Sequence, residues 1–329
     1  MTDELARWAA ARGPALRARA EEEAVAVLRD ALVAAALDER GSPQAAEQRP
    51  EPREPEAEHE PGELLWAYCV LSAESPHPVH QPGVAPAGTV EPIEAAGLTA
   101  LVSRVPRAEF GEQPLRRNLN DLTWLERVAR AHESVLERTL EESTIVPLRL
   151  CTLYESDEGV RDMLTREAPA LLGALELLAG REEWSVKVLV DPARLAEEAR
   201  SRSDQVKALE GELAGRGGGG AYMLRRRLER QVREQADSLA RELAGQVHAQ
   251  FEERSLDAVT RQPQNRELSG HEGDMLLNSA YLVERERVSE LQDLATRLEQ
   301  DHRALGARIE LSGPWPPYNF VPAGTAAVP

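Results

Sequence analysis

Cysteine is scarce in this chain of 329 residues, which contains only Cys69 and Cys151. A structural zinc site needs clustered Cys and His ligands, and a disulfide-stabilised secreted scaffold needs several cysteine pairs. Both cysteines lie in apolar, strand-like runs, where an unpaired cysteine is commonly buried. We therefore expect two buried free thiols in a reducing compartment, and no metal site.

Long apolar runs are also missing. No uncharged stretch of about 18 apolar residues occurs, so we expect no membrane-spanning helix. The first residues are charged from the outset and lack the basic-then-apolar pattern of a secretory signal. Acidic residues outnumber basic ones, and the formal net charge of −18 disfavours nucleic acid or an anionic membrane as a partner. These features predict a cytoplasmic protein.

The most strongly patterned stretch covers residues 118–154. Apolar positions recur there at the three-to-four spacing of one buried helix face, which predicts a helix over 122–140. These positions are Leu122, Leu125, Val128, Ala129, His132, Val135, Leu136 and Leu140. Asn120 or Asp121 can cap this helix. Residues 145–154 are apolar or β-branched apart from Arg149, which predicts a strand that is covered on both faces.

The chain is predicted to begin with a helical N-terminal extension over residues 1–40, followed by a disordered Pro/Glu-rich linker over 41–63. An N-terminal α+β domain over 64–181 comes next. Its expected elements are strands at 64–71 and 98–105, a short strand near 88–91, the 118–154 unit, and a helix over 157–179 that Pro169 kinks or divides.

Residues 182–329 are predicted to form a second α+β domain with an aromatic and Pro-rich tail. Strands are expected at 184–190, 255–262, 275–283 and 307–312, and helices at 192–213, 222–253 and 285–305. The resulting β-α-β-β-α-β order is that of a ferredoxin-like fold, here with a long helical hairpin inserted in the first crossover. The fold class is therefore α+β, with two small domains.

Three motifs invite a chemical interpretation. The glycine run at 215–220 lacks the Gly-Lys-Ser/Thr of a phosphate-binding loop, so we favour a flexible turn. The following Arg225, Arg226 and Arg227 could hold an acidic partner or a phosphate, although a solvated helix face is the simpler interpretation. His132 lacks the second histidine that a zinc helix requires, and its place on the apolar face favours a hydrogen-bonded core histidine.

Aromatic residues make up only 4% of the chain, so places where they gather are informative. The segment after the last expected strand combines three aromatic residues with three prolines, which restrict the backbone. It contains Trp315, Pro316, Tyr318, Asn319 and Phe320. Two interpretations stay open: this tail covers the core of the second domain, or it forms a docking strip for a partner.

Several long motifs resemble the gas vesicle protein L/F family (GvpL/GvpF). The first half contributes LLWAYCVL, LVSRVPRAEFGE, NLNDLTWLERVARAHESVL and VPLRLCTLY, and the second half WSVKVLVD, LLNSAYLVERE and GPWPPYNFV. The resemblance covers residues 64–321 and leaves out the extension and the linker. It implies a two-domain α+β protein that is not an enzyme and has neither catalytic residues nor a cofactor.

The resemblance also indicates which residues matter as structural or partner-contact positions. They are Phe110, Trp124 and His132 in the first domain, and Trp315, Pro316, Tyr318, Asn319 and Phe320 in the tail. The implied function is that of an assembly factor in gas vesicle formation, which binds the small hydrophobic shell protein and other accessory proteins. Such a protein would be found in the cytoplasm and on the vesicle, where it could remain as a minor component.

Two other functions stay open at this point. A ligand-sensing regulatory protein would use the ferredoxin-like domain, with Arg149 and Lys187 as the strand-borne basic residues. An enzymatic function would depend on a metal held by His77 and His80, which lie in a Pro-rich loop. The oligomeric state stays open as well.

Overall fold

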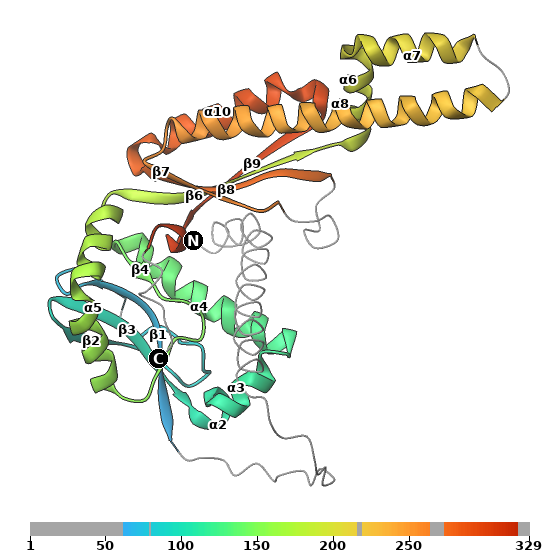
Figure 1. Cartoon of the computed structure of the whole chain (residues 1–329). Coiled ribbons are helices and arrows are strands. Elements are labelled where there is room, and N and C mark those ends of the chain that lie inside the picture. The colour runs from blue at the N-terminus through green and yellow to red at the C-terminus, as the bar shows by residue number, and fades with distance from the viewer. Residues whose placement is uncertain (1–61, 79, 216–218, 264–272, 322–329) are drawn as a thin grey trace, which may run out of the picture. The chain divides into compact units, whose positions relative to one another are not determined.

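The computed structural model describes residues 62–78, 80–215, 219–263 and 273–321 (Figure 1). The chain divides into two compact units, the first made of Met1–Ala179 with Pro316–Pro329 and the second of Gly180–Trp315. The expected helical extension and all but the last two residues of the expected linker lie outside the described residues. So does most of the glycine run at 215–220.

The sheet of the first unit has the strand order β2-β3-β1-β4, with β5 also pairing with β1. Its strands are β1 (Glu63–Ser72), β2 (Val90–Ala95), β3 (Leu98–Pro106), β4 (Val146–Pro147) and β5 (Leu153–Tyr154), and every pairing is antiparallel. The strands expected at 64–71 and 98–105 are confirmed. The strand expected near 88–91 is longer and lies further along, because Ala96 and Gly97 form a two-residue hairpin turn with positive φ angles of 52° and 76°.

In the described residues of the first unit, four helices accompany this sheet. They are α2 (Arg107–Phe110), α3 (Glu112–Asn118), α4 (Leu122–Glu142) and α5 (Asp157–Leu178). The expected helix α4 is confirmed, and Asp121 caps it by accepting hydrogen bonds from the backbone N–H groups of Thr123 and Trp124. Leu122 was wrongly placed on the buried face, since 74% of it is exposed. Pro169 lies inside α5 without dividing it.

The continuous strand expected over 145–154 is wrong. Only β4 and β5 pair with β1 there, and the chain between them leaves the ladder in a turn. Cys151 has a φ of +66°, and the backbone N–H and hydroxyl of Thr152 both donate to the carbonyl oxygen of Arg149. Two bonds still hold the segment to β1, from the N–H of Leu148 to Tyr68 O and from the N–H of Ala67 to Thr152 O. Arg149 and Cys151 therefore lie in a loop and not in the middle of the sheet.

Both faces of β1 are buried. Trp66 and Tyr68 share a core with Leu125, Val128 and Leu136 of α4. Leu65, Ala67 and Val70 lie outside that core and are also buried, and α5 contacts β1, β2 and β3. The sheet is therefore covered on each side, as a run of apolar residues on both faces of a strand predicts.

The second unit has a four-stranded antiparallel sheet in the order β7-β8-β6-β9. Its strands are β6 (Arg181–Val190), β7 (Asp257–Arg261), β8 (Asp274–Glu284) and β9 (Ala307–Trp315). Its helices are α6 (Pro192–Arg202), α7 (Asp204–Ala214), α8 (Gly219–Glu252) and α10 (Val288–Asp301), and the 3-10 turns η1 (Arg285–Arg287) and η2 (Arg303–Leu305) flank α10. The α+β class and the β-α-β-β-α-β order are confirmed, while the ferredoxin-like assignment stays a prediction.

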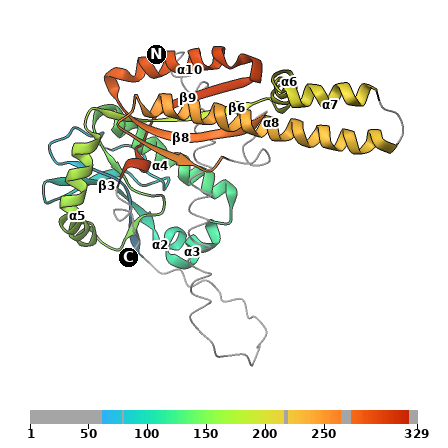
Figure 2. The same ribbon diagram turned by 45° about the horizontal axis from the view of Figure 1, so that its top comes forward.

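One helix expected in this unit is in fact two. The chain breaks at Ser203, whose backbone N–H still bonds to Ala199 O at the end of α6. Its side-chain oxygen accepts from the N–H of Val206 and so caps α7. Helices α7 and α8 lie side by side as a hairpin that extends past the ends of the strands in this unit (Figures 1 and 2).

None of the helices in the described ranges is both long and apolar enough to cross a membrane. Both cysteines are free thiols, as expected, but only Cys69 is fully buried and Cys151 is half-buried. Burial raises the pKa of the Cys69 thiol well above its ordinary value.

Candidate functional site

An aromatic cluster lies between β1 and α4 in the first unit. The ring of Trp66 meets that of Phe110 edge-on, with centroids 5.6 Å apart, and Phe110 in turn lies 5.5 Å from Trp124. Trp66 also contacts the imidazole of His132 at 5.9 Å. The three residues singled out in this domain, Phe110, Trp124 and His132, are thus brought together through Trp66. That tryptophan was missed as a member of the cluster, although its alternation with Tyr68 along β1 places both on one face.

His132 is fully buried and hydrogen-bonded at both ring nitrogens. The indole N–H of Trp66 donates to Nδ1 at 3.0 Å, so the proton of the neutral ring is on Nε2, which donates to Leu148 O at 3.2 Å. The ring also stacks on Tyr68, with centroids 5.3 Å apart. Burial lowers the pKa of His132 to about 4, so the ring stays neutral near pH 7. It behaves as a core histidine and holds α4 to β1 and to the loop after β4.

The outer edge of the cluster is polar. Oε1 of Glu109 accepts from the indole N–H of Trp124 at 2.7 Å and from Nη2 of Arg127 at 2.7 Å. The same guanidinium donates to Val84 O at 3.1 Å and lies 5.9 Å from the centre of the Trp124 ring. Glu109 and Arg127 thereby fix the orientation of Trp124, which is half-buried. The sequence gives no signal for this contact, because the partners are 15 and 18 positions apart on different elements.

The residues Pro316–Val321 belong to the first unit, whereas the tail was expected to continue the second domain. The turn η3 (Tyr318–Phe320) contains Tyr318, which packs against the core of the first unit and donates a 3.0 Å hydrogen bond to Oε1 of Glu133 on α4. Pro316 and Phe320 are buried, and Asn319 is half-buried. Within the second unit, Trp315 is buried and its indole N–H donates to Ser312 Oγ.

Burial of this kind favours a structural role for most of the eight residues singled out from the sequence. Their role as partner contacts stays a prediction. Only Trp124, Tyr318 and Asn319 among them retain partial exposure.

His77 and His80 do not form a metal site with other ligands. Nδ1 of His77 lies 3.1 Å from Ser75 O, and His80 has a φ of +60°. Across the described ranges, no group of three or more His, Cys, Asp and Glu residues could hold a metal ion.

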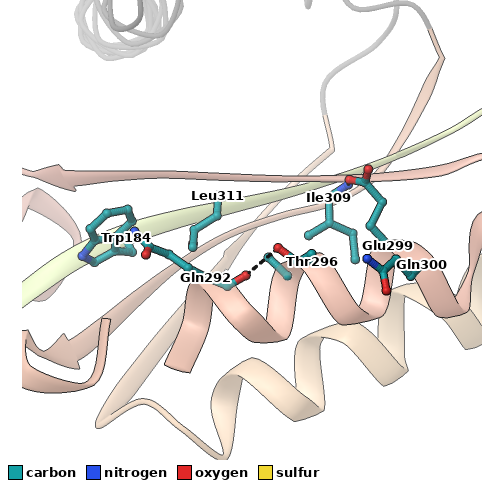
Figure 3. Close-up of a pocket in the computed structure, with 8 residues that line it drawn as sticks. Trp184, Gln292, Thr296, Glu299, Gln300, Ile309 and Leu311 are labelled. Carbon is teal, nitrogen blue, oxygen red and sulfur yellow. Dashed lines mark hydrogen bonds between the residues drawn. The ribbon is translucent and has the colours of Figure 1, made fainter. Parts of the chain in front are cut away.

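An open groove of about 360 Å³ lies between α10 and β9 in the second unit (Figure 3). Its lining consists of Trp184, Gln292, Ala295, Thr296, Glu299, Gln300, Ile309 and Leu311. The carboxylate of Glu299 accepts from the backbone N–H of Ile309 at 2.9 Å, so the charged group of the groove is already bound. Neither Arg149 nor Lys187 lines it. The groove therefore does not provide the basic contacts expected of a ligand-sensing site.

The outer face of α5 is unusually apolar for a surface helix. Leu171, Leu175 and Leu178 are buried, while Leu172 and Leu177, which flank this buried stripe on either side, are 46% and 43% exposed. Residues 168–179 contain a single charged side chain, that of Glu176. Exposed leucines beside a buried apolar stripe, with few charges around them, are typical of a contact surface for another molecule.

Comparison with known proteins identifies the family. The family described as "Gas vesicle synthesis protein GvpL/GvpF" matches residues 64–322. A gas vesicle protein L from a Streptomyces species is 36% identical over 227 residues, which cover 68% of this chain and 79% of that protein. Gas vesicle protein F1 of Halobacterium salinarum is 23% identical over 262 residues, or 79% of this chain and 93% of that protein.

Solved structures show the same fold. The crystal structure of the gas vesicle protein GvpF from an Anabaena species superposes with a TM-score of 0.63 at 20% identity, and covers 80% of this chain and 100% of that one. GvpF from Microcystis aeruginosa gives a TM-score of 0.56 at 18% identity, over 78% of this chain and 98% of that one. The match to the family over residues 64–322 and the Streptomyces relative confirm the resemblance seen in the sequence motifs: the chain belongs to the GvpL/GvpF family.

Proposed function

We propose that this GvpL/GvpF family protein, which takes part in gas vesicle formation, is a non-enzymatic assembly factor that binds the small hydrophobic shell protein. A shell subunit with a strongly apolar face aggregates unless another molecule covers that face. An acidic protein with a net charge of −18 and an apolar contact surface can cover it and keep the complex dispersed. The protein works in the cytoplasm and on the vesicle, beside other gas vesicle accessory proteins.

The observation that carries this proposal is the outer face of α5. Leu172 and Leu177 are five positions apart on α5 and remain 46% and 43% exposed, whereas the buried leucines of α5 hold the helix on its sheet. The aromatic tail is less suited to a transient contact, because Trp315 and Phe320 are already buried. A modest apolar surface also fits an escort that must release its cargo, since small interfaces are typical of transient complexes.

Co-purification with the shell protein tests the contact. We expect the double variant Leu172→Glu with Leu177→Glu to retain about one tenth of the shell protein that the wild type retains, or less. Each introduced charge replaces an apolar contact at the interface. Leu122→Glu is the matched control, since Leu122 is 74% exposed and also lies on a helix of the first unit. Binding at the wild-type level by a folded double variant would contradict the assignment of α5 as the contact surface.

The role in assembly itself is tested separately. Deleting the gene should abolish vesicles or reduce their number, because shell subunits would then lack their escort. Vesicles of normal number and shape in the deletion strain would rule out an assembly function, whatever the co-purification shows.

A further inference from the structure

The start of α8 carries a concentrated positive charge in an acidic protein. Residues 219–233 contain five arginines and one glutamate, a formal charge of +4, whereas the whole chain has −18. We call its exposed side chains the basic α8 surface. This surface consists of Tyr222, Met223, Arg225, Arg226, Arg227, Glu229, Arg230 and Arg233, all exposed.

Most of these arginines are available for a partner. Within the described part of the chain, the side chains of Arg225, Arg227 and Arg233 form no ion pair and no hydrogen bond. Arg230 lies 3.9 Å from Glu234, a long contact on the same helix, and Arg226 lies 5.9 Å from the centre of the Tyr222 ring. Unpaired guanidinium groups are donors with a planar geometry that suits carboxylates.

Apolar side chains lie beside this charge. Tyr222 is 60% exposed and Met223 is 69% exposed, while Leu224 and Val232 on the opposite side of the helix are buried. Both exposed residues lie near the start of α8 (Gly219–Glu252). The α7–α8 hairpin extends past the strands of the second unit (Figure 2). A partner can therefore reach the arginines and the apolar side chains together.

The charge of the rest of the chain limits what this partner can be. A long polyanion such as nucleic acid, or an anionic membrane, would also face the strongly acidic remainder of the protein and be repelled by it. A short acidic polypeptide avoids that repulsion because it contacts only the basic α8 surface.

This chain itself contains such a polypeptide. Residues 47–61 carry six glutamates, two arginines and four prolines, a formal charge of −4. The six carboxylates are opposite in sign to the five arginines, and the formal charges of the two segments, −4 and +4, are equal in magnitude. The prolines can pack on Tyr222 and Met223, since aromatic side chains commonly receive proline in peptide recognition.

We propose that the basic α8 surface of one copy binds residues 47–61 of a second copy. The two surfaces differ, so the contact is heterologous, and a dimer keeps one free surface of each kind, the acidic segment of one copy and the basic α8 surface of the other. Association then continues beyond the dimer as concentration rises. It also weakens with salt, because the charges involved are exposed and the screening length falls from about 30 Å at 0.01 M to about 8 Å at 0.15 M.

Sedimentation velocity of the full chain tests this proposal. At about 20 mM salt the average mass should rise with protein concentration, and at about 300 mM it should return towards that of the monomer. Replacing Arg225, Arg226 and Arg227 by Gln should weaken association roughly tenfold, the combined effect of three exposed ion pairs. The matched control replaces Arg241, Arg297 and Arg303 by Gln, which changes the net charge equally on exposed residues of the same unit, and should associate like the wild type.

A mixing experiment distinguishes this contact from general charge effects. A second variant replaces Glu51, Glu54, Glu56 and Glu58 by Gln. At protein concentrations where each weakened variant alone is monomeric, their equimolar mixture should form dimers and nothing larger, since the pair retains one intact surface of each kind. A wild type that is monomeric at low salt, an arginine variant that associates normally, or a mixture that stays monomeric would each overturn the proposal. Binding of the shell protein is not involved, so these outcomes do not depend on the proposed function.

Discussion

The hydroxyl of Tyr318 donates a hydrogen bond to the buried carboxylate of Glu133 across 185 positions of the sequence, at a distance of 3.0 Å. Glu133 lies on the buried side of α4, one residue from His132. The last described segment of the chain is therefore part of the same packing that holds α4 to β1.

Tyr318→Phe should destabilise the first unit by about 1–3 kcal/mol, because the buried carboxylate loses a donor while the ring remains. Urea unfolding followed by tryptophan fluorescence, to which Trp66 and Trp124 of the first unit contribute, measures the change. Tyr222→Phe is the control: Tyr222 is exposed, so its change should stay within about 0.5 kcal/mol. Equal stability of Tyr318→Phe and the wild type would show that the bond contributes nothing.

The fold should lose stability as pH falls from 6.5 towards 4. Burial lowers the pKa of His132 from 6.5 to about 4 in the folded protein, so the unfolded state takes up a proton first. The contribution of the neutral His132 ring to the free energy of unfolding is fully present above pH 6.5. It is lost as the pH falls to about 4, and the loss amounts to about 3 kcal/mol.

The variant His132→Gln isolates this effect from the protonation of carboxylates, which both proteins share. The free energy of unfolding of the wild type should approach that of His132→Gln as pH is lowered from 7.5 to 4. Parallel pH profiles of the two proteins would show that His132 titrates normally in the fold.

Two glycine substitutions should have opposite signs. A Cβ at Gly83 would lie 2.6 Å from Ser103 Oγ and 2.7 Å from the Tyr68 hydroxyl, which are bonded to each other at 2.6 Å. Gly83→Ala should therefore cost about 1–3 kcal/mol, the range for overpacking a core. A Cβ at Gly173 meets no atom within 4 Å, so Gly173→Ala in α5 should stabilise by about 0.5–1 kcal/mol. Urea midpoints measure both. A midpoint of Gly83→Ala at or above that of the wild type would contradict the packing around Gly83, and a lowered midpoint of Gly173→Ala would contradict the open space around Gly173.

Leu148→Asp should unfold the first unit, because Leu148 is fully buried and an unpaired buried charge costs several kcal/mol. Leu148→Ala is the milder companion, with an expected loss of about 2–5 kcal/mol from the cavity that it leaves. Thermal unfolding measures the folded variants. An Asp variant that melts cooperatively at the wild-type temperature would mean that Leu148 is not in the core.

Much of the fold could be predicted because the sequence pattern is local. The spacing of apolar residues located α4, β1 and β3, and the order of elements in the second unit followed from the same reasoning. The pattern fails where a few polar contacts decide the backbone. Residues 145–154 read as one strand because they are apolar, but the left-handed Cys151 and the bonds of Thr152 to Arg149 O turn the chain out of the ladder. The break at Ser203 depends on one capping side chain in the same way.

The site was predictable only in part, for a related reason. Phe110, Trp124 and His132 were singled out through family motifs, but the residues that connect them belong to distant segments. Trp66 lies 66 positions from His132, and Glu133 lies 185 positions from Tyr318. No periodicity or spacing relates such pairs, so their contacts become visible only in the folded chain.

The position of Tyr318 also has a consequence for biosynthesis. The ribosome makes all of Gly180–Trp315 before it makes the segment that packs against α4. Domains of a nascent chain usually fold in order from the N-terminus. Here the first unit must wait, with Glu133 still lacking the Tyr318 hydroxyl, until the second unit has been translated. The unit that begins first is therefore the one that is completed last.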